Sequence, residues 1–481
     1  MNANVDSQVV LDLFTTMNKI PRGSGNEKAI SDFLVKFAKD RHLEVSQDEQ
    51  WNVIMRKPAS PGYEDRPSII LQGHIDMVCE KSADATHDFT KDPITCIIDG
   101  EWMHADKTTL GADNLMGVAM ALAVFDSSTI AHGPLEGLFT TNEETGMEGA
   151  AAIKKGALQG QYLLNIDTEV EGEFIVSCAG GCRIDVGIPL LREYPSDIYD
   201  AALEISIDGL LGGHSGIEIH KQRANALQIL ARALYDLSHE YSYQLANFHG
   251  GSKHNAIPRK ATCLLTVKKE DVPAIKNWFI AKALAYRAEF TPQDKDLTIV
   301  VTDATIPNTV YADDTTEALI TFLFLAPNGV FSMSQSLDNL VEASNNLAIV
   351  KESDHTIDIL ISIRSSNRNT LAFIKDKLLR LADVLGLQHE VIGSYPAWEY
   401  DAGSKLEEQA ISLYTTMFGK EPKVTAIHAG LECGLLKGAL PNTQMISFGP
   451  TITGAHTPEE KVYLPSVTRI YTYLVALLKQ L

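Results

Sequence analysis

The sequence lacks several features that would assign it to common protein classes. Its first residues, MNANVDSQVVLDLF, contain no basic stretch followed by an apolar core, so they predict no signal peptide. The chain also contains no apolar run long enough to cross a bilayer. Only six of its 481 residues are cysteine, which is too few for a disulfide framework, and we expect reduced thiols. These absences predict a cytoplasmic protein.

Positive charge is also scarce. The chain has 41 Lys and Arg residues against 62 Asp and Glu residues, which gives a formal net charge of −21. A protein this acidic is a poor partner for nucleic-acid phosphates and for anionic membranes, so we expect it to bind neither. Carboxylates instead suit divalent cations. The charge therefore favours a metal-binding protein.

Helix and strand patterns alternate in both end regions of the chain. Short apolar runs predict strands at Ser68–Leu71, Leu135–Thr141 and Tyr162–Ile166, and near Gln444–Phe448. Between the first two runs, Leu115–Phe125 predicts a buried helix. This β-α-β rhythm is typical of an α/β layered domain.

The middle of the chain has a different pattern. It predicts strands and helices in mixed order, with Pro, Asn and Asp in the segments that connect them. A chain of this length favours two domains. We therefore predict that residues 1–184 and 396–481 form one domain, and that residues 185–395 form an inserted α+β domain.

Polar segments follow the predicted strands of the outer domain. These are GHID (73–76), NEETG (142–146), DTE (167–169) and GAHTPEE (454–460), while LGADN (110–114) precedes the buried helix. The carboxyl ends of strands in an open α/β sheet converge on one crevice. We therefore expect one cluster of side chains from distant parts of the sequence: His74, Asp76, Asp113, Glu143, Glu144, Asp167 and His456.

Each segment alone has a simpler explanation. His74 and Asp76 could end a strand on a wet loop, Asp113 could cap a helix, and Glu143 with Glu144 could form a solvated turn. Together, however, two histidines and three carboxylates suit two zinc ions that share one bridging carboxylate. Adjacent residues point to opposite sides, so one of Glu143 and Glu144 can bind metal while the other faces substrate.

The segments GHIDMV, LGADN, EETG, NIDTE and GAHTPEE, in this order, resemble those of the M20 family of metallopeptidases. The resemblance covers essentially the whole chain and extends to the family's bacterial cytosolic dipeptidases. It implies a zinc-exopeptidase-like catalytic domain, with a mixed sheet flanked by helices, interrupted by an inserted lid domain.

The resemblance also implies a role for each residue of the expected cluster. His74, Asp113 and Asp167 would bind one metal ion, and Asp113, Glu144 and His456 the other. Glu143 would be the general base, and Asp76 would orient His74.

The inserted domain contains three further segments that resemble the family. GLLGGHSG (209–216) offers His214, KHNAIP (253–258) offers Asn255 and ISIRSS (361–366) offers Arg364. By the resemblance, His214 reaches a substrate oxygen near the metals and Arg364 binds the substrate carboxylate, for which a guanidinium fork is well suited. From the residues alone, His214 could be an ordinary loop histidine and Arg364 a surface charge.

The resemblance therefore predicts hydrolysis of dipeptides, including Xaa-His dipeptides, by a hydroxide that bridges two divalent ions. We expect Zn²⁺, with Co²⁺ or Mn²⁺ as substitutes, and a homodimer formed through the lid. The long insert leaves open whether His214 acts in its own chain or in the partner chain.

Two other functions stay open at this point. One is an N-acyl amino-acid deacylase or carboxypeptidase of the same family, because the residues named so far handle only the amide and the terminal carboxylate. The other is a non-catalytic metal-binding protein. Glu143 argues against the second, because metal storage needs no unligated carboxylate beside the ions.

Overall fold

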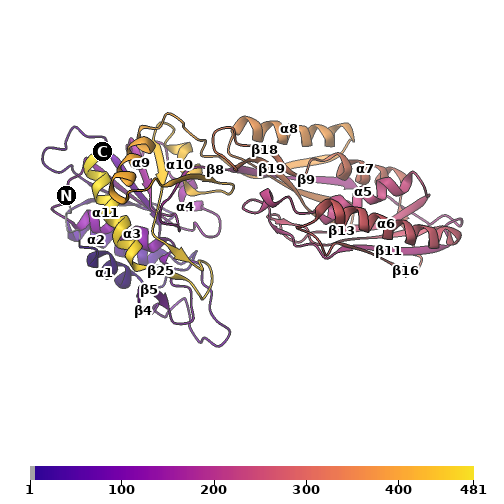
Figure 1. Cartoon of the computed structure of the whole chain (residues 1–481), viewed down its shortest axis with the longest axis horizontal. Coiled ribbons are helices and arrows are strands. Elements are labelled where there is room, and N and C mark those ends of the chain that lie inside the picture. The colour runs from indigo at the N-terminus through magenta and orange to yellow at the C-terminus, as the bar shows by residue number, and fades with distance from the viewer. Residues whose placement is uncertain (1–5) are drawn as a thin grey trace. The chain divides into compact units, whose positions relative to one another are not determined.

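The computed structural model describes residues 6–481, and the chain divides into two compact units. The first unit comprises Met1–Cys178, Tyr400–Ala426 and Leu431–Leu481, and the second comprises Ala179–Glu399 with Ile427–Gly430. Figure 1 shows both units along the chain. None of the helices within residues 6–481 is long and apolar enough to span a membrane. The domain bounds and the lid role that we inferred from the sequence stay a prediction.

An eight-stranded mixed sheet lies at the centre of the first unit. In spatial order its strands are β1 (Glu44–Gln47), β2 (Val53–Lys57), β6 (Leu135–Thr140), β3 (Ile69–His74), β7 (Tyr162–Asn165), β23 (Gln444–Ser447), β8 (Glu173–Cys178) and β22 (Lys423–Ile427). The central strands β6, β3, β7 and β23 run parallel, while β2 and β8 pair antiparallel with their neighbours. The four strands predicted from apolar runs are confirmed.

Helices flank this sheet, which confirms the predicted α/β class. They are α1 (Gln8–Met17), α2 (Lys28–Asp40), α3 (Ala112–Asp126), α4 (Glu148–Ala152), α9 (Lys405–Phe418), α10 (Glu432–Ala439) and α11 (Leu464–Gln480). Nearly every residue of α3 is buried, as expected of a helix that is apolar on all sides. Gly73 of β3 faces α3, whereas its neighbour Gln72 bonds to Glu432 of α10. Because successive residues of a strand point to opposite faces, α3 and α10 cover opposite faces.

A smaller four-stranded sheet also belongs to the first unit. Its order is β24 (Ile452–Thr453), β25 (Lys461–Tyr463), β5 (Trp102–Ala105) and β4 (Cys96–Asp99). The loop from β24 to β25 contains His456, whose φ of +64° is uncommon for a residue with a side chain.

The second unit is built on an antiparallel nine-stranded sheet. Along it lie β16 (Thr298–Ala304), β11 (Ala201–Asp208), β15 (Ala261–Val267), β13 (Tyr243–Gly250), β19 (Val341–Glu352), β20 (Thr356–Ser365), β9 (Gly180–Pro189) and β21 (Gln388–Tyr395), with β18 (Gly329–Met333) paired to β19. Short pairs are formed by β10 (Arg192–Glu193) with β17 (Val310–Tyr311), and by β12 (Gly213–His214) with β14 (Ala256–Ile257).

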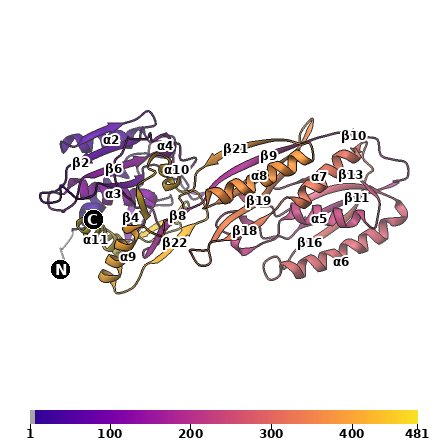
Figure 2. The same cartoon turned by 90° about the horizontal axis from the view of Figure 1, so that it is seen from above.

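The helices of the second unit pack on its sheet and bury one continuous apolar core. They are α5 (Ala226–Ser238), α6 (Val272–Phe290), α7 (Asp313–Leu325) and α8 (Arg368–Val384). Figure 2 shows α8 along β9, and α5 and α6 by β11 and β16. Along β20 the isoleucines at 357, 359, 361 and 363 point into the core. Arg364 follows Ile363 and therefore points to the opposite face.

Candidate metal centre

Two close approaches of the backbone bring distant polar residues together in the first unit. A side chain at Gly73 would lie 2.3 Å from Asn114 Oδ1, and one at Gly117 would lie 2.1 Å from the Ile166 carbonyl oxygen. Glycine at both positions therefore lets α3 pack directly against the ends of β3 and β7. As a result, the first turn of α3 lies beside His74, the last residue of β3, and beside Asp167.

The first turn of α3 leaves Asp113 available for other partners. The helix N-cap is Gly111, and the carboxylate of Glu460 accepts hydrogen bonds from the amides of Leu110, Gly111 and Ala112 at 2.7–2.9 Å. A distant glutamate thus fills the capping position that Asp113 could have taken. The alternative interpretation of Asp113 as the helix cap is wrong.

The side chains expected to bind metal form two groups that share Asp113. In the first, His74 Nε2 lies 3.2 Å from Asp113 Oδ1 and 3.6 Å from Asp167 Oδ1. In the second, His456 Nε2 lies 3.3 Å from Asp113 Oδ2 and 3.0 Å from Glu144 Oε2. Within each group the ligand atoms lie within 4.8 Å of one another. A third such group joins His74 with Glu143 and Glu144.

These groups fit two divalent ions. Asp167 Oδ1 and Glu144 Oε1 are buried and have no hydrogen-bond partner within residues 6–481. A buried carboxylate oxygen without a partner is costly, and a metal ion would satisfy it. Imidazole nitrogen and carboxylate oxygen together are a ligand set that zinc accepts.

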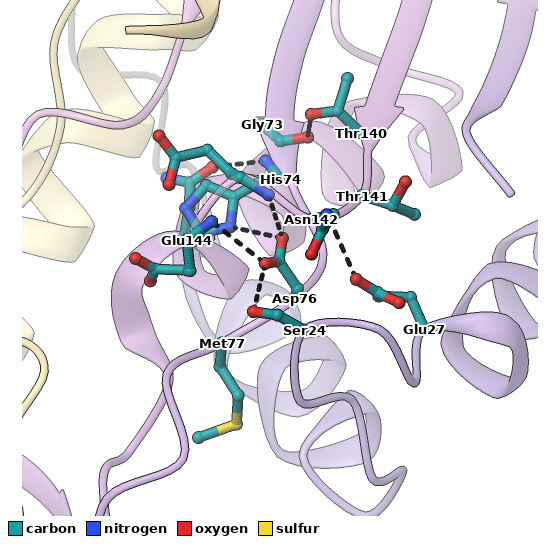
Figure 3. A network of polar contacts seen from close by, with 12 residues as sticks. Ser24, Glu27, Gly73, His74, Asp76, Met77, Thr140, Thr141, Asn142 and Glu144 are labelled. Atoms are coloured by element: carbon teal, nitrogen blue, oxygen red, sulfur yellow. Dashed lines mark hydrogen bonds and ion pairs between the residues drawn. The ribbon is translucent and has the colours of Figure 1, made fainter. Parts of the chain in front are cut away.

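Asp76 is the centre of a hydrogen-bond network that supports the cluster (Figure 3). Its Oδ1 lies 3.3 Å from His74 Nδ1, while Ser24 Oγ donates to its Oδ2 at 2.8 Å. The backbone amides of Glu143 and Glu144 also donate to its carboxylate, at 3.1 and 3.2 Å. Asp76 therefore fixes the His74 ring and the Glu143–Glu144 turn together. Such a carboxylate beside a ligating imidazole maintains ring orientation.

The acidic surroundings change the pKa of several groups. Burial raises the pKa of Glu143 to about 8, and the nearby charges of Glu432, Glu144 and Asp113 act in the same direction. Burial alone would raise the pKa of Asp113, but hydrogen bonds with His456 and His74 keep it well below its usual range. Contacts with Asp113 and Glu144 raise the pKa of His456 to about 11. Several buried carboxylates so close together are costly unless cations lie among them and compensate their charge.

Sequence reasoning gave no role to Glu432, a buried carboxylate near this cluster. Glu432 is 2% exposed, and its Oε2 accepts hydrogen bonds from Gln72 Nε2 at 2.6 Å and from Thr140 Oγ1 at 2.7 Å. No predicted strand precedes Glu432, so no local signal marked it. Its two donors belong to β3 and β6, and they anchor the start of α10 to the sheet.

The remaining expected residues, His214, Asn255 and Arg364, all belong to the second unit. His214 Nδ1 accepts hydrogen bonds from the amides of Gly216 and Ile217, at 3.1 and 3.0 Å. The Asn255 carbonyl accepts from Ser215 at 2.9 Å.

Arg364 lies among other basic groups of the second unit. Its Nη1 donates to Tyr395 Oη at 2.9 Å, while its Nε is buried and has no partner within residues 6–481. Burial and the positive charge of Arg364 lower the pKa of His214, and they lower the pKa of His428 to about 3. The sequence did not indicate His428, which lies 2.7 Å from Ser344 Oγ. The charged group here is the guanidinium of Arg364, whose Nε, partner-free within residues 6–481, suits an anionic ligand.

Comparison with known proteins gives consistent matches. Residues 70–480 match the family described as Peptidase family M20/M25/M40. The cytosol non-specific dipeptidase of Escherichia coli (strain K12) is 37% identical over 479 residues, which span 100% of this chain and 99% of that protein. The crystal structure of aminoacylhistidine dipeptidase from Vibrio alginolyticus, also 37% identical, has a TM-score of 0.93 and covers 98% of this chain and 96% of its own.

A more distant structure shares the fold alone. Aminopeptidase PepT from Bacillus cereus ATCC 10987 is 16% identical with a TM-score of 0.56, and the match covers 99% of this chain and 98% of that chain.

Proposed function

This chain belongs to the peptidase family M20/M25/M40, as its motifs predict, and on that basis we propose that it is a cytoplasmic metallopeptidase that hydrolyses dipeptides. The observation that carries the proposal is the pair of ligand groups that share Asp113, with Glu143 beside them. Its support is the 37% identity, over the full length of both chains, to a cytosolic dipeptidase.

We propose two divalent ions, Zn²⁺ in the native enzyme with Co²⁺ or Mn²⁺ as substitutes. His74, Asp113 and Asp167 would hold one, and Asp113, Glu144 and His456 the other. These ions would supply Lewis-acid activation of water and of the scissile carbonyl.

Glu143 would move the proton in the reaction. Its carboxylate accepts no hydrogen bond from any other side chain of residues 6–481, unlike that of Asp76, so it is available to an incoming water. Glu143 would take a proton from that water as the water attacks the carbonyl carbon. It would then give the proton to the leaving amine as the peptide bond breaks.

The second unit would bind the other parts of the substrate. We propose that Arg364 pairs with the C-terminal carboxylate, that His214 stabilises the developing oxyanion, and that Asn255 contributes a further polar contact. A fixed carboxylate site would limit the length of the peptide, which favours dipeptides.

Replacing Arg364 by alanine should raise KM for dipeptides by about 10- to 100-fold, because a charge-assisted hydrogen bond to the carboxylate is lost. The C-terminal amides of the same dipeptides should be poor substrates of the parent, and the substitution should change them little. Steady-state kinetics on each matched pair measures the difference. An equal loss on dipeptides and on their amides would show that Arg364 supports the fold instead.

A substrate panel tests the function itself. Free dipeptides, including Xaa-His dipeptides, should be hydrolysed, while N-acetyl amino acids and longer peptides should be poor substrates. Product formation by amino-acid analysis, with and without a chelator, measures this. Preference for N-acetyl amino acids would replace the proposal by a deacylase, and activity that survives strong chelation would refute metal catalysis.

We further propose a homodimer formed through the second unit, since a two-fold pair is the commonest assembly of soluble oligomers. Light scattering on the purified protein should give the mass of two chains. A mass of one chain at working concentration would contradict the dimer and would leave His214 to act within its own chain.

A further inference from the structure

One carboxylate at the edge of the proposed metal site has no role in the mechanism. Glu169 lies two residues after Asp167 and is half-buried. Within residues 6–481 its side chain makes no hydrogen bond or ion pair, and it belongs to none of the ligand groups described above. The charged groups that act on it are Asp113, Glu144, Glu460 and His456, all from the site or its support.

The neighbouring carboxylates already have hydrogen-bond or ion-pair partners within the protein. Asp76 holds His74 and Ser24, and the four backbone amides that start α3 surround Glu460. Glu432 bonds to Gln72 and Thr140 and is almost fully buried, so a substrate cannot reach it. Glu171, two residues beyond Glu169, forms a two-pronged ion pair with Arg469 at 2.5 and 2.6 Å. Glu169 therefore differs from these neighbours in being both accessible and unpaired.

The backbone of Glu169 is fixed. The amide of Ile452 donates to its carbonyl at 2.9 Å, and Thr168 Oγ1 lies 2.9 Å from Ser447 Oγ. A side chain at Gly449 would lie 2.0 Å from the Thr168 carbonyl, so the two segments are packed backbone to backbone. The loop that follows β7 thus has a fixed backbone at Glu169, two residues beyond Asp167.

The site is rich in carboxylates. Eight gather there: Asp76, Asp113, Glu143, Glu144, Asp167, Glu169, Glu432 and Glu460. They outnumber the basic side chains among them, which are His74, His456 and Arg22. Such surroundings favour a positively charged group of the substrate over a neutral acyl group in its place.

We propose that Glu169 binds the free α-amino group of the dipeptide and thereby selects aminoacyl substrates over N-acyl amino acids. This inference rests on the proposed function, since it identifies the residue that recognises the substrate's N-terminus. The ammonium donates hydrogen bonds to an ionised carboxylate, which is the stronger class of hydrogen bond. Glu143, the other unpaired carboxylate, stays free for the water.

A matched pair of substrates tests the proposal. L-alanyl-L-histidine and N-propanoyl-L-histidine differ only in the α-amino group. In the metal-loaded enzyme, Glu169→Gln should lower kcat/KM for the first by about 10- to 100-fold and change the second by less than about threefold. Glu169→Asp, which keeps the charge, should restore part of the loss.

Two further measurements separate recognition from structure. Calorimetry in the Glu143→Gln background should show that adding Glu169→Gln weakens binding of alanyl-histidine but not of propanoyl-histidine. Glu171→Gln is the control. It also removes one negative charge, but Glu171 lies two residues beyond Glu169 and its carboxylate is already paired with Arg469. It should leave the ratio of the two substrates unchanged.

The outcomes distinguish this proposal from the proposed function. Equal losses on both substrates, or loss of metal from Glu169→Gln, would overturn the role of Glu169 while the parent remained a dipeptidase. A parent enzyme that prefers propanoyl-histidine would overturn the dipeptidase function, and the role of Glu169 with it.

Discussion

Replacing Glu143 by glutamine should lower kcat by about 100- to 10,000-fold, the usual contribution of a general base and acid. Glutamine has nearly the same shape, but it cannot take a proton from water. Glu143 lies beside the ligands without being needed by either of the two groups that share Asp113. Metal content measured by elemental analysis should therefore stay at two equivalents per chain.

The experiment is informative because kcat and metal content distinguish a general base from a metal ligand. Near-normal kcat in Glu143→Gln would refute the general-base role. Loss of metal together with activity would instead mean that Glu143 is a ligand, as the third ligand group, with His74 and Glu144, would allow. Thr145→Ser, at an exposed position two residues further along the same turn, is a conservative control for the local fold.

Replacing the adjacent Glu144 by glutamine should have a different effect. Glu144 Oε2 lies 3.0 Å from His456 Nε2, and its Oε1 is buried without a partner, so we expect it to hold the second ion. A neutral amide is a weaker ligand. The variant should lose at least about 100-fold in affinity for that ion, since even partners outside the ligand set contribute about 10- to 100-fold.

Activity of Glu144→Gln should fall with the metal and should recover in part at high zinc concentration. Elemental analysis after dialysis should then find one equivalent per chain instead of two. Two retained equivalents with lost activity would contradict the assignment of Glu144 as a ligand. The two adjacent substitutions should therefore differ. Glu143→Gln should abolish proton transfer and keep both metal ions, whereas Glu144→Gln should lose one of the ions.

The parallel strands of the first unit were predictable from the sequence for a physical reason. Parallel strands buried on both faces give unbroken apolar runs, and polar residues that follow such runs fall at one edge of the sheet. The close approach of His74 and Asp167 was predicted in this way. His456 was the least local of the set, because its loop follows the short strand β24 and approaches Asp113 only in the folded chain.

The supporting interactions were not predictable, because their partners are far apart in sequence. Glu460 caps α3 from 349 residues away, and Glu432 reaches Gln72 from 360 residues away. No local pattern encodes either contact. The inclusion of Ile427–Gly430 in the second unit is likewise a tertiary property, since this short segment interrupts residues that otherwise belong to the first.

Titrating the metal-free protein with zinc while following hydrolysis of one dipeptide tests the central claim most directly. Two ions that share Asp113 predict no activity without metal and full activity at two equivalents of zinc per chain. Glu143→Gln should bind the same two equivalents and stay inactive. Full activity at one equivalent, or without any metal, would contradict a two-metal dipeptidase.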